Sequence, residues 1–232
     1  MSKCPLPMPR PTLALERAAG APKVLVAGVD EVGRGPLAGP VVAAAVILPA
    51  GRGRRKLAET VADSKVLTAA VRQALARDIR QAAIVGVGAA CVGEIQRLNI
   101  LHASLLAMRR ALRALPVPAG HVLVDGNRLP DGLDCAGEAV VDGDTQCASI
   151  AAASIVAKVT RDLIMARLAP LYPGYGWERN AGYATREHCA ALERLGLTPH
   201  HRRTYAPVAA ILAGEIPTPD ADEALPVPLP RP

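Results

Sequence analysis

The chain has 232 residues, half of them apolar, with 27 Lys and Arg against 21 Asp and Glu. This length and composition are typical of one globular α/β domain, and the chain is long and apolar enough to bury a hydrophobic core. The formal charge of +6 favours a polyanionic partner, whereas the lack of Phe and the single Trp argue against gripping single strands with stacked aromatic rings.

The cysteines and apolar runs exclude further classes of protein. The five cysteines are odd in number and lack Cys-x-x-Cys spacing, so the sequence predicts neither a zinc site nor a disulfide framework. No apolar run approaches a membrane span, and residues 1–22 lack the apolar core of a signal peptide. We therefore expect a cytoplasmic protein without membrane contact, and a monomer, because nothing in the sequence indicates an oligomer.

Hydrophobic periodicity predicts strands first and alternating helices and strands later. Residues 1–21 predict a flexible N-terminal segment, and the Pro-rich residues 214–232 a disordered tail, leaving one domain over 22–213. An α/β fold with a mixed sheet flanked by helices follows, its first two strands antiparallel. The predicted elements are strands 24–29 and 41–48, a helix after the N-cap Thr68, strand 84–91, helix 94–115, strands 122–125 and 138–141, and helices 147–169 and 186–195.

Adjacent carboxylates stand at the end of the first apolar run. The run from Lys23 to Val29 predicts a buried strand, so Asp30 lies where the strand leaves the sheet and Glu31 points to the other side. Carboxylates this close repel each other and require a cation between them or protonation. Because oxygen ligands suit hard divalent ions such as Mg2+ or Mn2+, the pair indicates a metal site.

Two further acids follow predicted strands. Asp125 precedes Gly-Asn, which turns the chain and leaves the carboxylate at the rim of the sheet. Asp144 precedes a predicted helix, whose positive end favours an ionised carboxylate. Taken alone, Asp125 is most often a turn residue and Asp144 an N-cap, and Asp142 competes with Asp144 for the same role.

The motif Asp30-Glu31-Val-Gly-Arg-Gly-Pro-Leu-Ala-Gly-Pro-Val42 resembles ribonuclease HII. The resemblance extends over about residues 24–210, and its further segments, in order, are Asp63-Ser-Lys65, Val124-Asp-Gly-Asn127, Gly143-Asp144, Ala151 to Lys158 and Gly182-Tyr183. It implies a ribonuclease H-like mixed sheet with a C-terminal helical region. It also implies an endonuclease that degrades the RNA strand of RNA–DNA hybrids and nicks duplex DNA on the 5′ side of embedded ribonucleotides.

The resemblance further implies a catalytic set of four acids that holds two divalent ions, Mn2+ or Mg2+. In two-ion hydrolysis, one ion prepares a water and the other stabilises the leaving oxygen, which gives 3′-hydroxyl and 5′-phosphate ends. The set is compatible with Mn2+ or with Mg2+, and with any of its carboxylates as the bridge between the two ions. The four acids are Asp30, Glu31, Asp125 and Asp144.

The segment Gly33-Arg34-Gly35 is implied to contact the ribose. A nuclease that detects one ribonucleotide in duplex DNA must test the 2′-hydroxyl, and the family does so with its Gly-Arg-Gly segment. Gly33 and Gly35 let the backbone come close to a ligand, although a tight turn alone would also explain them.

The remaining substrate contacts implied by the resemblance are a lysine and a tyrosine. Lys65 is expected to bind a phosphate, and Tyr183 matches a tyrosine that stacks on the sugar at the RNA–DNA junction. A surface salt bridge and a half-buried core position are the ordinary alternatives for these residues. Two positions depart from the family, because Val66 and Ala181 stand where lysines are frequent, and we expect this to change phosphate affinity more than chemistry.

Other functions account for less of the sequence. A dinucleotide-binding loop would also place glycines after a strand, but the spacing Gly-x-Gly-x-x-x-Gly and the prolines Pro36 and Pro40 oppose the helix that receives a pyrophosphate. A non-catalytic nucleic-acid binder explains the positive charge but not four acids at strand ends. Within the nucleases, ribonuclease HIII carries a lysine in the position of Arg34.

Overall fold

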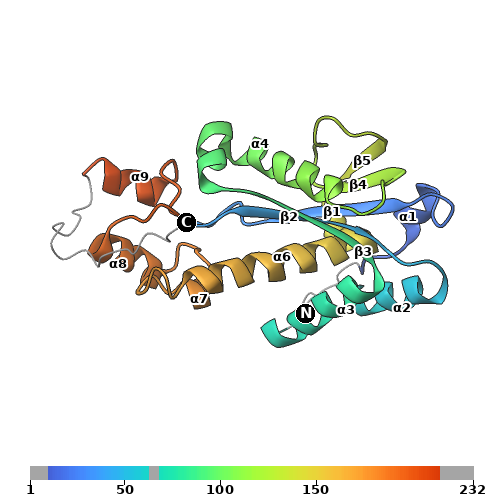
Figure 1. Cartoon of the computed structure of the whole chain (residues 1–232), viewed down its shortest axis with the longest axis horizontal. Coiled ribbons are helices and arrows are strands. Elements are labelled where there is room, and N and C mark those ends of the chain that lie inside the picture. Colours follow the sequence, from blue (N-terminus) through green and yellow to red (C-terminus); the bar gives the residue numbers. More distant parts are fainter. Residues whose placement is uncertain (1–9, 63–67, 215–232) are drawn as a thin grey trace, which may run out of the picture.

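The computed structural model describes residues 10–62 and 68–214, and a five-stranded sheet lies at its centre (Figure 1). The strands are β1 (Val26–Val32), β2 (Val41–Ile47), β3 (Ile84–Ala90), β4 (His121–Asp125) and β5 (Ala136–Val140). Their order is β3-β2-β1-β4-β5. β2 pairs antiparallel with β1 and β3, whereas β4 pairs parallel with β1 and β5. The predicted mixed sheet, with its first two strands antiparallel, is confirmed.

Helices cover both faces of the sheet and extend past one of its ends. They are α1 (Ala14–Ala18), α2 (Gly51–Ala62), α3 (Ala69–Ala82), α4 (Val92–Arg113), α5 (Gly143–Gln146), α6 (Ala148–Leu168), α7 (Trp177–Asn180), α8 (Arg186–Leu195) and α9 (Ala206–Leu212). Helix α4 lies over one face, and α2, α3 and α6 lie over the other (Figure 1). The C-terminal helices α7, α8 and α9 gather beyond the end of the sheet.

Alternating strand residues separate two aliphatic cores, as the composition predicts. Val29 and Ala43 pack with α4 on one face, whereas Ala44 and Val46 pack with α3 and α6 on the other. Gly28 of β1 lets α6 lie directly on the strand, because a Cβ at that position would stand 2.2 Å from the carbonyl carbon of Ser149. This close approach brings α6 beside the end of β1 where the predicted catalytic acids lie.

The aromatic side chains concentrate in the C-terminal region. Tyr172, Tyr175 and Trp177 are buried and pack in one cluster with Leu37 and Ala38 from the connection between β1 and β2. The backbone N–H of Leu37 also donates to the carbonyl of Gly182, at 2.8 Å. The C-terminal helices therefore fix the loop that follows the predicted catalytic acids.

The N-terminal segment corrects one prediction. Residues 10–21, expected to be flexible as part of 1–21, instead pack against the domain through α1. The side chain of Glu16 is only 2% exposed, and its Oε1 accepts the backbone N–H of Ser149 at 2.7 Å. A carboxylate at the start of α6 satisfies an N–H that the helix itself leaves free, so α1 is anchored by a helix end distant in sequence.

Two helices also differ from the sequence prediction. Helix α2 lies where the sequence predicts no element, and buried Leu57 and Val61 anchor it. The predicted helix 94–115 begins earlier, at Val92, and is interrupted by Asn99, whose φ of 62° is left-handed. The Oδ1 of Asn99 accepts the N–H of Leu101 at 3.0 Å, so the side chain caps the second part of the helix.

The other predicted strands and helices are present with ends shifted by a few residues. None of the helices in residues 10–62 and 68–214 is both long and apolar enough to cross a membrane. Of the predicted disordered tail, only Gly214 belongs to the described residues.

Candidate active site

Asp30 and Glu31 lie near the C-terminal end of β1, and their side chains point to opposite faces of the sheet. Asp30 is 6% exposed, and its Oδ1 accepts the backbone N–H of Glu31 at 2.7 Å. Burial, followed by the charges of Asp125 and Glu31, raises the pKa of Asp30 well above its ordinary value, against a hydrogen bond from Ser154 of α6. Burial also raises the pKa of Glu31, although the neighbouring Arg34 guanidinium lowers it.

Asp125 comes to Asp30 through the parallel pairing of β4 with β1. Val29 pairs with Val124, so the next residue on each strand is one of these acids. Leu123 packs with Ile150 of α6, and Asp125, two residues on, faces the same side of the sheet as Asp30. The two carboxylates are therefore brought together by strand register.

Asp125 is held by the turn that contains Asp144. Its Oδ1 accepts the backbone N–H of Gly143 at 2.7 Å, and the N–H of Asp144 also donates to it. Burial raises the pKa of Asp125, and the charges of Asp144 and Asp142 add to this effect. Asp142 is exposed, with a left-handed φ of 52°, whereas Asp144 is half-buried, so the geometry favours Asp144 over Asp142 as the fourth acid.

The donor chemistry of these acids fits a hard divalent ion. Carboxylates from β1, β4 and α5 lie at one rim of the sheet, where burial and then repulsion between charges raise the pKa values of Asp30 and Asp125, and a cation among the carboxylates would relieve that repulsion. Within residues 10–62 and 68–214, no three His, Cys, Asp or Glu side chains already form a coordination sphere. An ion shared by these acids would therefore require some of their side chains to turn toward it.

The segment Gly33-Arg34-Gly35 follows the two acids directly. Gly33 has a φ of +96°, a conformation that favours glycine, whereas a Cβ on Gly35 would meet only open space. The exposed side chain of Arg34 reaches back to Oε1 of Glu31 at 3.3 Å. The structure therefore places the predicted ribose-contacting segment beside the predicted metal ligands.

Tyr183 lies beside the same loop and is 39% exposed. The Nζ of Lys158 stands 5.6 Å from its ring centroid, and the Cζ of Arg161 stands 5.8 Å away. The carbonyl of Tyr183 accepts a hydrogen bond from Nδ1 of His188 at 2.9 Å. An exposed ring beside a lysine ammonium is suited to packing on the sugar of a nucleic acid.

The remaining predicted contact, Lys65, lies outside the described residues. Arg161 was not predicted from the sequence, and, like Arg202, it is fully buried next to the Gly-Arg-Gly loop. A signal for Arg161 exists, since Ala153, Ala157, Arg161 and Met165 follow one another at helical spacing on the buried face of α6. An arginine on an otherwise apolar, buried face of a helix indicates that its charge has a structural or functional role.

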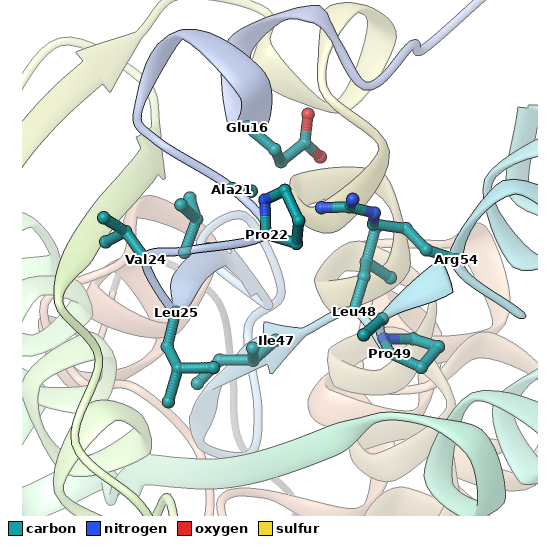
Figure 2. A pocket seen from close by; sticks show the side chains of 11 residues that line it. Glu16, Ala21, Pro22, Val24, Leu25, Ile47, Leu48, Pro49 and Arg54 are labelled. Atoms are coloured by element: carbon teal, nitrogen blue, oxygen red, sulfur yellow. The ribbon is translucent and has the colours of Figure 1, made fainter. Parts of the chain in front are cut away.

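A small cavity lies away from these acids, between α1, the end of β2 and the start of α2 (Figure 2). It has a volume of about 60 Å3 and is lined mostly by apolar residues, with Glu16 and Arg54 at its edge. None of the predicted site residues lines it, so the candidate active site is the open rim of the sheet.

Comparisons with known proteins agree with this site. A family model for ribonuclease HII matches residues 27–208. The chain is 61% identical over 205 residues to a ribonuclease HII of Rhodospirillum rubrum, covering 88% of this chain and 92% of that protein. It is 59% identical over 208 residues to a ribonuclease HII of Granulibacter bethesdensis, covering 89% and 93%.

The fold agrees as well. The crystal structure of ribonuclease H2 from Pyrococcus horikoshii matches with a TM-score of 0.70 and 28% identity, covering 82% of this chain and 97% of that one, which confirms the predicted ribonuclease H-like fold. Because the family model and the sequence identities both span most of its length, the chain belongs to the ribonuclease HII family, whose enzymes are endonucleases that hydrolyse RNA in RNA–DNA hybrids.

Proposed function

We propose that this chain cuts the RNA strand of RNA–DNA hybrids and nicks duplex DNA on the 5′ side of embedded ribonucleotides, leaving 3′-hydroxyl and 5′-phosphate ends. The observation that carries the proposal is the pairing of β1 with β4, which brings Asp30 and Asp125 to adjacent strand ends beside the Gly-Arg-Gly loop. The formal charge of +6 supports a polyanionic substrate.

The chemistry is assigned to the four acids. Asp30, Glu31, Asp125 and Asp144 would hold two Mn2+ or Mg2+ ions, which supply Lewis-acid activation of water and charge stabilisation at the leaving oxygen. Burial makes Asp30 and Asp125 reluctant to ionise without a cation, which supports their role as ligands. The backbone N–H bonds to Asp125 orient its carboxylate before any ion binds.

Selection of the ribose is assigned to the neighbouring loop. Gly33 and Gly35 would let the backbone approach the 2′-hydroxyl, and Arg34 would sit at the phosphate next to the cut. The exposed ring of Tyr183 would stack on the sugar at the junction. These contacts would place the scissile phosphate next to the acids. Binding of one ribose would thereby determine which phosphodiester bond is cut.

A charge-neutral substitution tests the assignment of the acids. Asp125→Asn keeps an oxygen that can accept the N–H of Gly143 but removes the negative charge, so we expect cleavage of an RNA–DNA hybrid to fall at least about 100-fold. Duplex binding and thermal stability should hold or rise, because a repelled carboxylate is removed. The exposed loop acid Asp131 provides the control, since Asp131→Asn should leave all three unchanged.

Two outcomes would contradict this assignment. Cleavage by Asp125→Asn at the rate of the unsubstituted protein would exclude Asp125 from the chemistry. Loss of the folded state, measured by circular dichroism, would instead make Asp125 a structural residue.

A further inference from the structure

Two fully buried arginines lie behind the Gly-Arg-Gly loop. Arg161 of α6 and Arg202, after α8, are both 0% exposed. Neither forms an ion pair with an acid among the described residues, although a buried charge is costly without compensation. The compensation comes from main-chain carbonyls, and nearly all of these belong to the connection between β1 and β2.

Arg161 binds the second half of that connection. Its Nε donates to the carbonyl of Pro40 at 3.0 Å, and its Nη2 to the carbonyl of Ala38 at 2.9 Å. Its Nη1 donates to the carbonyl of Ala181 at 2.9 Å, two residues before Tyr183. One guanidinium therefore ties the loop to the segment that carries Tyr183.

Arg202 binds the first two residues of the Gly-Arg-Gly segment and, further along the connection, Gly39. Its Nη2 donates to the carbonyl of Gly33 at 2.6 Å, and its Nη1 to the carbonyl of Arg34 at 2.9 Å. The carbonyl of Gly39 accepts from both Nε and Nη2. The hydroxyl of Tyr205 accepts from Arg202 and donates to the carbonyl of Arg34, which makes a second link to the same peptide.

These bonds set the direction of the peptide groups in the loop. In a planar trans peptide, the N–H of one residue points opposite to the carbonyl of the residue before it. Because the carbonyls of Gly33 and Arg34 point at the buried guanidinium of Arg202, the N–H groups of Arg34 and Gly35 point away from the interior. They are donors held ready for a substrate oxygen.

Arg161 and Arg202 together hold the loop and are called the clamp below. The clamp also explains why glycine stands at position 33. A Cβ on Gly33 would lie 2.2 Å from Nε of Arg161, in addition to the strain of its φ of +96°. The loop, Arg161 and Arg202 are therefore packed as one unit, in which a side chain at Gly33 would displace a guanidinium from its carbonyls.

We propose that Arg161 and Arg202 are positioning residues that fix the Gly33-Arg34-Gly35 backbone for reading a single ribose. This inference rests on the proposed function. Lysine cannot replace either arginine, because a lysine ammonium is a point charge on a flexible stem, whereas the planar guanidinium directs its donors in a fixed fork. The two arginines act through the loop and touch neither the scissile phosphate nor the acids.

The clamp affects substrates unequally. A duplex with one ribonucleotide can be cut in only one register of the duplex on the protein. A loosened loop that binds the ribose in a shifted position therefore gives complexes that are not cut. An RNA–DNA hybrid offers a ribose in every register, so the same loosening leaves many alternatives. Removing the clamp should therefore lower kcat/KM more for the single ribonucleotide than for the hybrid.

The test compares kcat/KM for these two substrates in Arg161→Lys and Arg202→Lys. The ratio of the two values is independent of the folded fraction of the preparation, so a purely structural defect would not move it. We expect the ratio of hybrid to single-ribonucleotide cleavage to rise at least about tenfold, as the loss of charged hydrogen bonds allows. Arg167→Lys, at an exposed position on the same helix as Arg161, should leave the ratio unchanged.

A milder variant covers the case in which a buried lysine prevents folding. Tyr205→Phe removes only the hydroxyl that links Arg202 to the Arg34 carbonyl, and we expect the ratio to rise about threefold. Hydrogen exchange of the amides in residues 33–40 should quicken in the same variants. An active unsubstituted protein whose variants all keep the ratio would overturn the clamp alone, whereas an unsubstituted protein that cleaves neither substrate would overturn the proposed function itself.

Discussion

Acid should destabilise this protein through a pair of buried histidines in the C-terminal region. Nε2 of His188 lies 3.1 Å from Nε2 of His201, and both rings are almost fully buried. The fixed donors determine the tautomers: Trp177 Nε1–H donates to His188 Nε2 at 3.1 Å, and the backbone N–H of Thr198 donates to Nδ1 of His201 at 2.9 Å. His201 therefore donates from Nε2 to His188, and both rings are neutral.

A proton added to either ring would face an existing donor. Burial, followed by the charges of His188 and His200, lowers the pKa of His201 to about 3. Since the pKa of His201 is depressed in the fold, its stabilising effect is complete above the unfolded value near 6.5 and is lost as the pH falls toward 3. Between pH 7 and pH 4 this loss amounts to about 3 kcal/mol of unfolding free energy.

The measurement is the unfolding free energy from urea titrations at pH 4 to 7.5. Burial also raises the pKa values of Asp30, Glu31 and Asp125, so the informative quantity is the difference from His201→Asn, which removes the titrating ring but retains an acceptor for Thr198. That difference should shrink by about 3 kcal/mol between pH 7 and pH 4. The exposed His102 gives the control variant His102→Asn. A difference that stays constant across this range would refute the assignment of a neutral, buried pair.

Three substitutions test other parts of the structure. Arg34→Ala should slow nicking at a single ribonucleotide while changing the unfolding free energy by less than about 1 kcal/mol, because its contact with Glu31 is exposed; an unchanged nicking rate would remove its substrate role. Gly28→Ala should lower the unfolding free energy in urea by at least about 2 kcal/mol, since its Cβ would overlap Ser149, and a neutral result would mean that α6 can move away. Glu16→Ala should cost about 1 to 3 kcal/mol in thermal unfolding by leaving the Ser149 N–H unpaired, and full stability would show that α1 is dispensable.

The sheet and its acids were predictable because their signals are local. An apolar run that ends in Asp30 and Glu31, and a second that ends in Asp125, mark strand ends in the sequence itself. Parallel register between those strands then brings the acids together. The choice of Asp144 over Asp142 comes from the resemblance to the family, and the structure adds that Asp142 is exposed and left-handed whereas Asp144 is half-buried.

The clamp and the histidine pair were not predictable, because both depend on contacts between distant residues. Arg202 binds carbonyls more than 160 positions earlier in the chain, and main-chain acceptors leave no trace in the sequence. Helix α2 was missed for a different reason. Its Gly-Arg-Gly-Arg-Arg start contains two glycines, which disfavour a helix, and no apolar stripe, and the later residues Leu57, Ala58 and Val61 attach it to the core.

Cleavage of a duplex with one embedded ribonucleotide would show the proposed activity of the four acids and the loop together. A labelled DNA duplex carrying a single ribonucleotide is incubated with the protein in Mn2+, in Mg2+ or in EDTA, and the cut and its ends are mapped. We expect a nick on the 5′ side of the ribonucleotide, with 3′-hydroxyl and 5′-phosphate ends, in the presence of a divalent ion and none in EDTA. Tight binding without a cut in either metal, or a cut on the 3′ side that leaves a cyclic phosphate, would contradict it.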